Sequence, residues 1–430
     1  MGRRIVYIMI GIQVSQIVIK CTHLRNGNRC PHPFNCVILI QMDWNLVKRK
    51  FSNQLIDVEV NGGMFVLAGI LFLVVYGLLV FYIGWSGWSW MKPVVSARFR
   101  WLYIVALVFL AVSFILARLF GSISFLSVIG SYWLAIFSLL LLILPVVHLT
   151  LWLLRLTRIP RHYAHKWAGV VTLVLLLFTM GYGIYNAYSP VVRQYSIQID
   201  KKVEGVDNLN IVMAADMHFG LLSGPAHAKR MVEEINALKP DLVLYPGDII
   251  DDNLDMYLKS GIADIISGIQ APYGVYASLG NHDKYNGPIE DLISALEKSN
   301  MQVLYDDKIT LDDKITLIGR KDRTEKDRAE VAMLMQDTDL SKPVLMMDHQ
   351  PYDLDIAEQN NVDLVVSGHT HRGQIAPAQF ITKAIYENDW GYLQKGSMHS
   401  IVTSGFGFWG PPIRTSSRSE IVQIHVTFQQ

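Results

Sequence analysis

Residues 209–218 read LNIVMAADMH, an apolar run that stops at an aspartate and a histidine. The apolar part, Leu209 to Ala215, predicts a buried β-strand, and Asp216 and His218 follow at the point where that strand ends. The same arrangement is found at four places farther along the chain. These are 242–251 (LVLYPGDIID), 275–283 (VYASLGNHD), 344–349 (VLMMDH) and 364–371 (LVVSGHTH).

Amphipathic stretches lie between the first three of these strands and predict helices over Pro225–Leu238, Leu254–Ile269 and Pro288–Ser299. Another alternating strand is predicted at Ile421–Thr427. Buried strands that alternate with helices indicate a layered α/β domain. In open α/β folds, ligands bind beyond the carboxyl ends of the strands. We therefore expect the five polar groups to converge, with glycines at 247, 280 and 368 permitting the sharp turns.

The converging residue types indicate a metal site. Aspartate, histidine and asparagine supply a mixed set of oxygen and nitrogen ligands, which suits divalent metals such as Mn, Fe or Zn. One Asp-x-His pair is common on a surface loop and would predict little by itself. Five groups of this kind, each after a predicted strand, make coincidence a poor explanation.

The composition predicts a second, different domain before this one. The chain has 430 residues, of which 51% are hydrophobic and only 17% charged, so an ordinary soluble enzyme, a disordered chain and a disulfide-stapled mini-protein are excluded. From Met64 to Ser189 there are eight basic residues and no acidic one. From Pro190 onward there are 34 acidic and 22 basic residues, a net charge of −12. A basic half followed by an acidic half suggests a membrane domain joined to a soluble one.

Four long apolar stretches predict membrane-spanning helices, because each is close to the roughly 20 residues needed to cross the hydrocarbon core. They are Met64–Trp85, Trp101–Phe120, Tyr132–Leu154 and Trp167–Tyr188. The first and third connecting loops carry seven Lys and Arg residues, and the second carries none. Positive loops stay in the cytoplasm, so we expect a multi-pass protein of the cell membrane whose C-terminal half is extracytoplasmic.

The chain is thus divided into an N-terminal extension (1–63), a four-helix transmembrane domain (64–189) and a catalytic domain (190–430). The extension is hard to interpret. Its apolar run Ile5–Ile19 is compatible with a signal-like or fifth spanning segment, but this would leave several basic residues on the wrong side. All three cysteines lie here without a metal-ligand pattern. We expect this stretch to be dispensable, with Met64 as the functional start.

Taken together, the strand-end residues resemble the calcineurin-like metallophosphoesterase family. The matching motifs are Asp216-x-His218, Gly247-Asp248-x-x-Asp251, Gly280-Asn281-His282-Asp283, His349 and Gly368-His369-x-His371. The resemblance covers nearly all of 190–430 and implies a four-layer α/β/β/α fold. Within the family, the chain is most similar to the bacterial membrane-associated branch. Its supporting residues are Asp348-His349-Gln350-Pro351, His371-Arg372-Gly373-Gln374, Ser404-Gly405 and Pro411-Pro412-Ile413-Arg414. The Ser/Thr protein phosphatases of the same superfamily have Asp-Arg-Gly after the second motif and Arg before the third. Here these positions hold Asp251-Asp252-Asn253 and Leu279, so a protein phosphatase is disfavoured.

The resemblance implies two divalent metal ions, with Mn expected first and Fe, Zn, Mg or Ni as alternatives. One would be held by Asp216, His218, Asp248 and His371, and the other by Asp248, Asn281, His349 and His369. Asp248 would bridge, and a hydroxide shared by both metals would attack phosphorus. His282 would act near the leaving group with Asp251 orienting it, while Arg372 and Arg414 are candidates for phosphate contact.

The expected function is hydrolysis of a phosphomonoester, phosphodiester or pyrophosphate outside the cytoplasm. Anchoring at the membrane favours a lipid-linked or cell-wall phosphate, so the expected partners are this substrate and membrane lipids, with no protein partner. Nucleic acid is disfavoured because the catalytic half is acidic and lacks a basic stripe. Two alternatives stay open: a non-catalytic metal-binding sensor coupled to the helices, and a transporter with a regulatory head. The spans lack the acidic residues and paired charges that favour a transporter.

Overall fold

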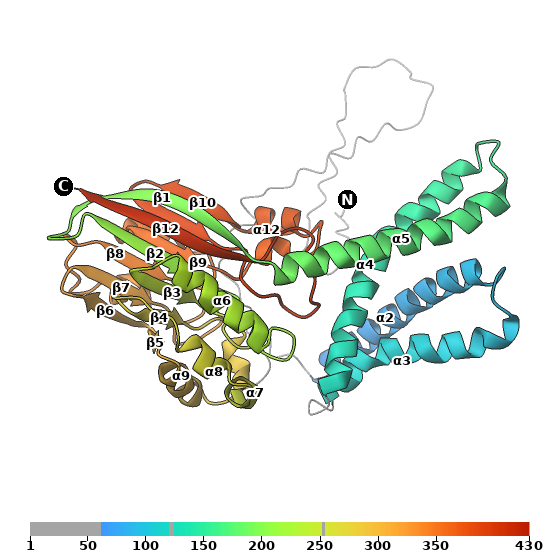
Figure 1. The fold of residues 1–430 in the computed structure, drawn as a ribbon, viewed down its shortest axis with the longest axis horizontal. Helices are drawn as coiled ribbons and strands as arrows, with labels where there is room; N and C mark the ends of the chain where they lie inside the picture. Colours follow the sequence, from blue (N-terminus) through green and yellow to red (C-terminus); the bar gives the residue numbers. More distant parts are fainter. Residues whose placement is uncertain (1–61, 120–123, 252–253, 430) are drawn as a thin grey trace, which may run out of the picture. The chain divides into compact units, whose positions relative to one another are not determined.

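The structure, a computed structural model, describes residues 62–119, 124–251 and 254–429. The apolar run Ile5–Ile19 and the three cysteines lie outside these ranges. Four long helices come first in the described part of the chain, and each is long and apolar enough to cross a membrane. They are α2 (Gly62–Met91), α3 (Arg100–Leu119), α4 (Ser124–Leu154) and α5 (Arg161–Tyr188), with the short 3-10 turn η1 (Ala97–Phe99) before α3. The four predicted spans are therefore confirmed as helices (Figure 1).

The helices extend beyond the apolar stretches that predicted them. α4 begins at Ser124, eight residues before the predicted start at Tyr132. Small residues such as Ser127 and Gly130 interrupt the strongly apolar run there, although a helix tolerates them when its face packs against a neighbour. Gly130 shows this packing, because an added Cβ would lie 2.7 Å from the Cα of Phe114 in α3.

The C-terminal half contains, within the described residues, two six-stranded sheets (Figure 1). The first has the order β1-β12-β2-β3-β4-β5 and the second β10-β11-β9-β8-β7-β6. The strands of the first sheet are β1 (Val191–Lys202), β2 (Asn208–Met213), β3 (Leu242–Pro246), β4 (Val275–Ser278), β5 (Gln302–Val303) and β12 (Glu420–Gln429). Those of the second are β6 (Asp307–Leu311), β7 (Ile315–Gly319), β8 (Val344–Met347), β9 (Leu364–Ser367), β10 (Gly391–Lys395) and β11 (Met398–Val402).

The strands that carry the predicted site run parallel within each sheet. Val243 of β3 pairs with Val212 of β2 on one side and with Val275 of β4 on the other. In the second sheet, β8 and β9 pair in parallel with Met346 opposite Val365. Parallel strands end at the same edge of a sheet, so the polar residues that follow them gather at one edge.

Apolar side chains from both sheets meet in a common core. Buried residues of the first sheet, such as Ile211 and Ile424, pack in one cluster with Leu317, Leu345 and Leu364 of the second. One further cluster lies between the first sheet and the helices on its outer face, and another lies between the second sheet and its helices. The helices over the first sheet are α6 (Pro225–Ala237), α7 (Leu254–Lys259), α8 (Ile262–Ile266) and α9 (Ile289–Lys298). Those over the second are α10 (Val331–Leu334) and α11 (Leu354–Gln359). The layers are therefore α/β/β/α, as expected.

Local patterns predicted the inner strands better than the outer ones. The strands β8 and β9 have the predicted bounds, 344–347 and 364–367, because each is a short apolar run that is buried at every position, with Ser367 as the one polar residue. β1 was not predicted, since its residues alternate with many polar side chains and its order depends on pairing with β12. The predicted helix Leu254–Ile269 is two helices, because Gly261 adopts a left-handed φ of +78° between them.

The shared core predicts how two leucines should differ in their effect on stability. Leu345, 1% exposed, lies between the sheets, so Leu345→Ala should lower the free energy of unfolding by about 2–5 kcal/mol through the cavity it leaves. Leu340 is 46% exposed, and Leu340→Ala should change it by less than about 0.5 kcal/mol. Denaturant unfolding of the detergent-solubilised chain measures both. Equal losses would contradict the packing of the two sheets.

Candidate metal centre

The first group of predicted ligands joins residues from both sheets. Asp216 and His218 follow β2, and His371 follows β9 in the 3-10 turn η3 (His371–Gly373). One ligand atom from each lies within 4.8 Å of the other two, and all three residues are buried. The Nε2 atoms of His218 and His371 are 3.2 Å apart, and His371 Nε2 is 3.7 Å from Asp216 Oδ1. This is an arrangement in which one cation can be held by all three.

The second group has the same construction. Asp248 follows β3, His349 follows β8, and His369 follows β9, with ligand atoms again within 4.8 Å of one another. His349 Nε2 lies 3.2 Å from Asp248 Oδ2 and 3.3 Å from His369 Nδ1. The other ring nitrogen of His349 is 2.8 Å from the carbonyl oxygen of Pro246, to which it donates. That bond orients the imidazole and leaves Nε2 directed at the group.

A single carboxylate lies between the two groups. Asp248 Oδ2 is 3.7 Å from His218 Nε2 in the first group and 3.2 Å from His349 Nε2 in the second. The backbone N–H of His282 donates to the other oxygen, Oδ1, at 2.8 Å. Asp248 therefore connects both groups and is held in place by the loop after β4.

The side chain of Asn281 lies in an environment that suits a bound metal ion. Its side-chain oxygen is buried and has no hydrogen-bond donor within the described part of the chain. A buried carbonyl oxygen without a partner is costly. A cation beside Asn281 would satisfy it, and the neighbouring carboxylate and imidazoles supply the remaining ligands. The residues present therefore fit a bound divalent metal.

Burial and mutual charge shift the acidity of the cluster. Burial raises the pKa of Asp216 to about 6. Burial alone would lower the pKa of His349, but the Asp248 carboxylate outweighs it and raises that pKa to about 10. Burial, aided by the charge of His349, lowers the pKa of His369 to about 4. Protons thus compensate the buried carboxylates, and an entering cation would replace them.

The backbone of the site is held in an uncommon conformation. Five of the predicted ligands have a positive φ: 53° at Asp216, 45° at His218, 53° at Asp248, 71° at His369 and 46° at His371. Side chains other than glycine rarely adopt such angles, and each costs of order 1–3 kcal/mol. The cluster is therefore strained, and the surrounding core must compensate for it.

The three glycines act in two different ways. Gly247 has a φ of +86° and makes the expected sharp turn. Gly280 and Gly368 have no positive φ, so the turn explanation is wrong for them. A Cβ on Gly280 would lie 2.1 Å from Asp248 Oδ1, and one on Gly368 would lie 2.3 Å from Asp216 Oδ2. These glycines are required because carboxylates pack directly against the backbone.

His282 and Asp251 lie at the edge of the cluster. His282 follows β4, is partly exposed, and starts the 3-10 turn η2 (Asp283–Asn286). Its Nδ1 is 3.7 Å from Asp251 Oδ1, whereas the same oxygen is 3.2 Å from Nδ1 of His218. The predicted pair therefore comes together. Asp251 is nevertheless shared, and it orients the candidate ligand His218 more closely than it orients His282.

The two arginines predicted to contact phosphate are both held by other groups of the protein. The guanidinium carbon of Arg372 lies 3.8 Å from the centroid of the Trp390 ring. Arg414 is fully buried and donates to the carbonyl oxygens of Gly405 and Gly407 at 2.8 and 2.6 Å. Its remaining donors bond the carbonyl oxygens of Ser404 and His371 and the hydroxyl of Ser417. Since the protein itself occupies these donors, the expectation that Arg414 contacts phosphate is corrected to a structural role.

Asp283 organises two of the site loops and was missed as a site residue. It is fully buried, and its carboxylate accepts from the backbone N–H groups of Ile249, Ile250 and Gly280 at 2.9, 3.0 and 2.8 Å. It therefore ties the loop after β3 to the loop after β4. Its position directly after His282 in the same motif was a signal that could have identified it.

Asp322 is a second buried carboxylate near the centre. It lies in the segment after β7 and accepts from the side-chain amide of Gln350 at 2.7 Å, next to the candidate ligand His349. The apolar run Ile315–Gly319 ends three residues before Asp322, but Arg320 and Lys321 come between them, so the strand-end pattern that marked the other groups was missed here.

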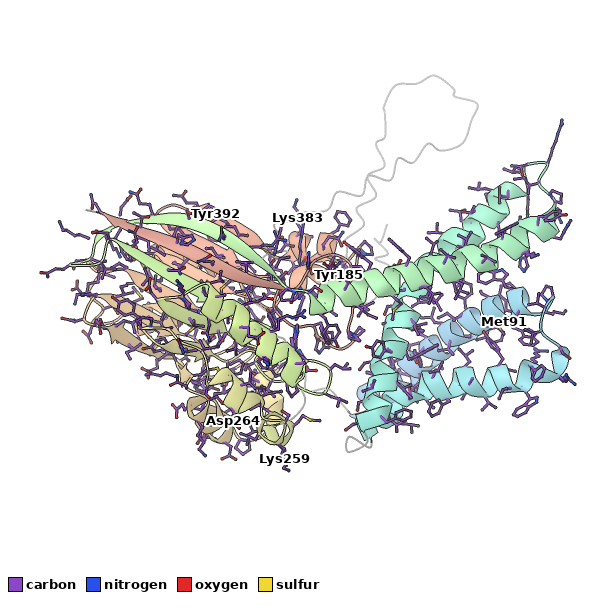
Figure 2. The ribbon with its side chains drawn as sticks, viewed as in Figure 1. Met91, Tyr185, Lys259, Asp264, Lys383 and Tyr392 are labelled. Carbon is purple, nitrogen blue, oxygen red and sulfur yellow. The ribbon has the colours of Figure 1, made fainter. Side chains whose placement is uncertain are left out.

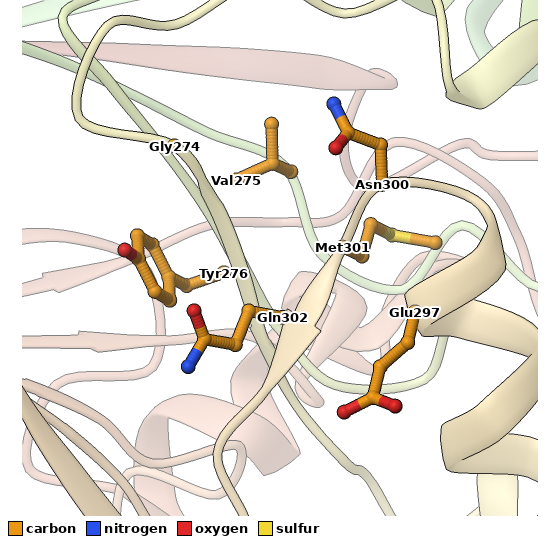
Figure 3. Close-up of a pocket in the computed structure, with 7 residues that line it drawn as sticks. All are labelled: Gly274, Val275, Tyr276, Glu297, Asn300, Met301 and Gln302. Atoms are coloured by element: carbon orange, nitrogen blue, oxygen red, sulfur yellow. The ribbon is translucent and has the colours of Figure 1, made fainter.

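A pocket of 310 Å³ lies elsewhere in the first sheet (Figure 3). The pocket lies at the amino end of β4, whereas the candidate ligands follow the carboxyl ends of the strands. The pocket and the ligands are therefore at opposite edges of the sheet. Its lining residues are Gly274, Val275, Tyr276, Glu297, Asn300, Met301 and Gln302. None of the predicted site residues lines it.

Known proteins with similar sequences agree with this geometry. A model of the calcineurin-like phosphoesterase family matches residues 209–373. Uncharacterized metallophosphoesterases of Helicobacter pylori and Campylobacter jejuni are each 32% identical, covering 58% and 59% of this chain and 68% of their own lengths. A transmembrane protein with metallophosphoesterase domain from Danio rerio is 30% identical over 59% of this chain and 62% of its own.

A dimetal phosphatase structure from Danio rerio matches at 12% identity with a TM-score of 0.28, covering 51% of this chain and 99% of that one, a likeness too weak to support an inference. The assignment therefore rests on the sequence relatives, which come from bacteria and from animals, and on the family model, which spans every strand-end motif. The chain belongs to the calcineurin-like metallophosphoesterase family.

Proposed function

We propose that this protein is a membrane-anchored phosphoesterase that uses two divalent metal ions. The observation that carries the proposal is the position of Asp248, whose Oδ2 contacts an imidazole of each ligand group. Among the ligand types present, a carboxylate is the one that gives an anionic oxygen to each of two cations. A single site would not require a carboxylate between two separate groups of histidines.

The ligand sets follow the two groups. We assign Asp216, His218 and His371 to one metal, and Asn281, His349 and His369 to the other, with Asp248 shared. Mixed oxygen and nitrogen ligands favour Mn, Fe or Zn, and we propose Mn first. When bound, two such cations lower the pKa of a water and offset the negative charge of a phosphate. The protein residues fix their positions.

His282 is proposed to act on the leaving group. Its ring is partly exposed while the six Asp and His ligands behind it are largely buried, so it faces the side from which an ester would enter. Its backbone N–H donates to Asp248, which holds His282 beside the residues that would bind the metals. Burial lowers the pKa of His282, so its protonated ring is a stronger proton donor but is present over a lower pH range than an ordinary imidazolium. Donation of a proton to the departing oxygen is the role that this position and chemistry support.

The membrane helices support an extracytoplasmic substrate. Four apolar helices and relatives described as transmembrane proteins support a membrane location. The basic residues in the first and third loops favour a catalytic half outside the cytoplasm. A phosphomonoester, phosphodiester or pyrophosphate at the membrane or in the cell wall is the proposed substrate. The acidic catalytic half disfavours nucleic acid.

Asp248→Asn tests the shared carboxylate. The amide has no anionic oxygen for a second cation, so this variant should lose metal from both sites, whereas His371→Ala should lose about one of two equivalents. The matched control Asp264→Asn changes an exposed carboxylate, labelled in Figure 2, and should retain both. Elemental analysis of purified variants gives the answer. Two full equivalents in Asp248→Asn would rule out the bridge.

His282→Ala separates catalysis from metal binding. The variant should keep its metals and lose roughly 10²–10⁴-fold in rate, the range usual for acid–base catalysis. The loss should shrink for nitrophenyl esters, whose leaving groups need no proton. The control His425→Ala changes an exposed histidine on β12 and should leave the rate unchanged. An equal loss on good and poor leaving groups would argue against proton donation, and metal binding without any turnover in the wild type would favour the sensor alternative.

Cysteine labelling tests the orientation. With the native cysteines replaced, Lys259→Cys should react with a membrane-impermeant maleimide in intact cells, because Lys259 lies on α7 with its side chain 77% exposed (Figure 2). Arg158→Cys, in the third loop, should react only after lysis. The reverse pattern would place the catalytic half in the cytoplasm and make soluble nucleotides possible substrates.

A further inference from the structure

The helix α12 (Gln379–Ile385) presents an apolar face to the outside. Phe380 is 70% exposed, Ile381 59% and Ile385 38%, and no residue of this helix is buried. Residues four apart share a helix face, so Ile381 and Ile385 lie together. Lys383, labelled in Figure 2, is exposed on the same short helix. A short helix with bulky apolar residues and a cation facing outward is poorly suited to water alone.

This helix is tied to the metal centre. The hydroxyl of Thr370, between the ligands His369 and His371, donates to the carbonyl oxygen of Asp389 at 2.7 Å. The carboxylate of Asp389 accepts from Thr382 of α12 at 2.8 Å. The helix therefore lies beside the loop that carries two of the candidate ligands.

A second exposed apolar side chain lies on another edge of the centre. Trp409 is 52% exposed, and its ring centroid is 5.6 Å from that of His282. The side chain of Gln374 bonds the backbone of Trp409 on both sides, accepting from its N–H and donating to its carbonyl oxygen at 2.9 and 3.0 Å. Tryptophan is enriched at membrane interfaces because it has an apolar ring and a polar N–H.

The loop that carries Trp409 is fastened to the end of the last membrane helix. The N–H of Arg414 donates to the carbonyl oxygen of Gly183 in α5, and the side chain of Asn186 donates to the carbonyl oxygen of Arg414 at 3.1 Å. Ile413 is fully buried in a cluster with Ala135 and Leu139 of α4.

The segment leading into α12 is fastened in the same way. Ile375 packs on the cluster formed by Ile413 with α4. Both apolar features, α12 and Trp409, thus continue from points where the catalytic half contacts the membrane helices.

We propose that α12 and Trp409, together called the lipid-facing rim, lie in the headgroup region of the bilayer, so that the metal centre acts on phosphates carried by lipids. This rests on the proposed function and names its substrate class. Continuity with α4 and α5 favours the bilayer over a soluble protein or a second copy. Exposed apolar side chains with a nearby lysine match the chemistry of an anionic lipid surface.

Lipid quenching tests the position of the rim. A fluorophore on Ile381→Cys, in a chain without native cysteines, is compared with one on Leu340→Cys in vesicles of phosphatidylcholine and phosphatidylglycerol. Leu340 is an exposed leucine two residues before Lys342. Lys342 pairs with Asp313 in the turn between β6 and β7, so Leu340 lies near the edge of the sheet that is away from the metal centre. Doxyl-labelled lipids should quench the probe at 381 and leave that at 340 unchanged. Equal signals, or excimer formation between pyrene labels at 381 on two copies, would overturn the proposal.

Activity on two substrates distinguishes a loss of lipid binding by the rim from a loss of catalysis. The double variant Phe380→Asp with Ile381→Asp should hydrolyse soluble nitrophenyl phosphate as the wild type does, but hydrolyse a long-chain lipid phosphate in vesicles roughly tenfold more slowly, because charged residues leave the interface. Leu340→Asp should match the wild type on both substrates. Equal loss on both substrates, or a wild type active only on the soluble ester, would overturn the lipid assignment. A wild type inactive on both would overturn the proposed function, while lipid quenching at 381 still decides whether the rim meets the bilayer.

Discussion

The structure depends on one buried carboxylate, Asp248, which lies within 3.7 Å of histidines from two separate groups. A buried charge is stable only when other charges or hydrogen bonds compensate for it. Here the compensation comes from the imidazole of His218 on the same sheet, from that of His349 on the other sheet and from the N–H of His282. Neither sheet alone supplies all the groups that compensate the charge of Asp248. The contact between the two sheets is therefore both the core of the fold and the condition for the metal centre.

This requirement explains the unusual backbone around the site. Five ligands adopt a positive φ, and carboxylates pack so closely on Gly280 and Gly368 that no Cβ fits. Such conformations persist only where the surroundings enforce them. Asp283 contributes by holding three backbone N–H groups of two loops at once. The apolar core between the sheets supplies the free energy that offsets the strain.

The segment from Ser404 to Ser419 connects the membrane helices to the metal centre. The backbone N–H of Gly407 donates to the carbonyl oxygen of Asp216, and that of Arg414 donates to α5. The buried guanidinium of Arg414 closes this segment on itself through several carbonyl oxygens. An arginine in that position serves as an internal crosslink. The end of α5 and the ligand loop are thereby held by the same few residues.

The four apolar helices, the inner strands and the strand-end groups that contain the seven candidate ligands could be predicted from the sequence, because each is a local pattern of apolar runs and the polar residues that end them. Which of these side chains meet could not be predicted in this way. His218 and His371 are 153 positions apart and come within 3.2 Å, Asp251 turns to His218 more closely than to His282, and Arg414 is buried with its donors bonded to carbonyl oxygens of the protein. The edge strand β1 likewise depends on its partner β12. A local pattern encodes which face of a segment is buried, whereas contacts between distant segments arise from packing, which no single stretch of sequence contains.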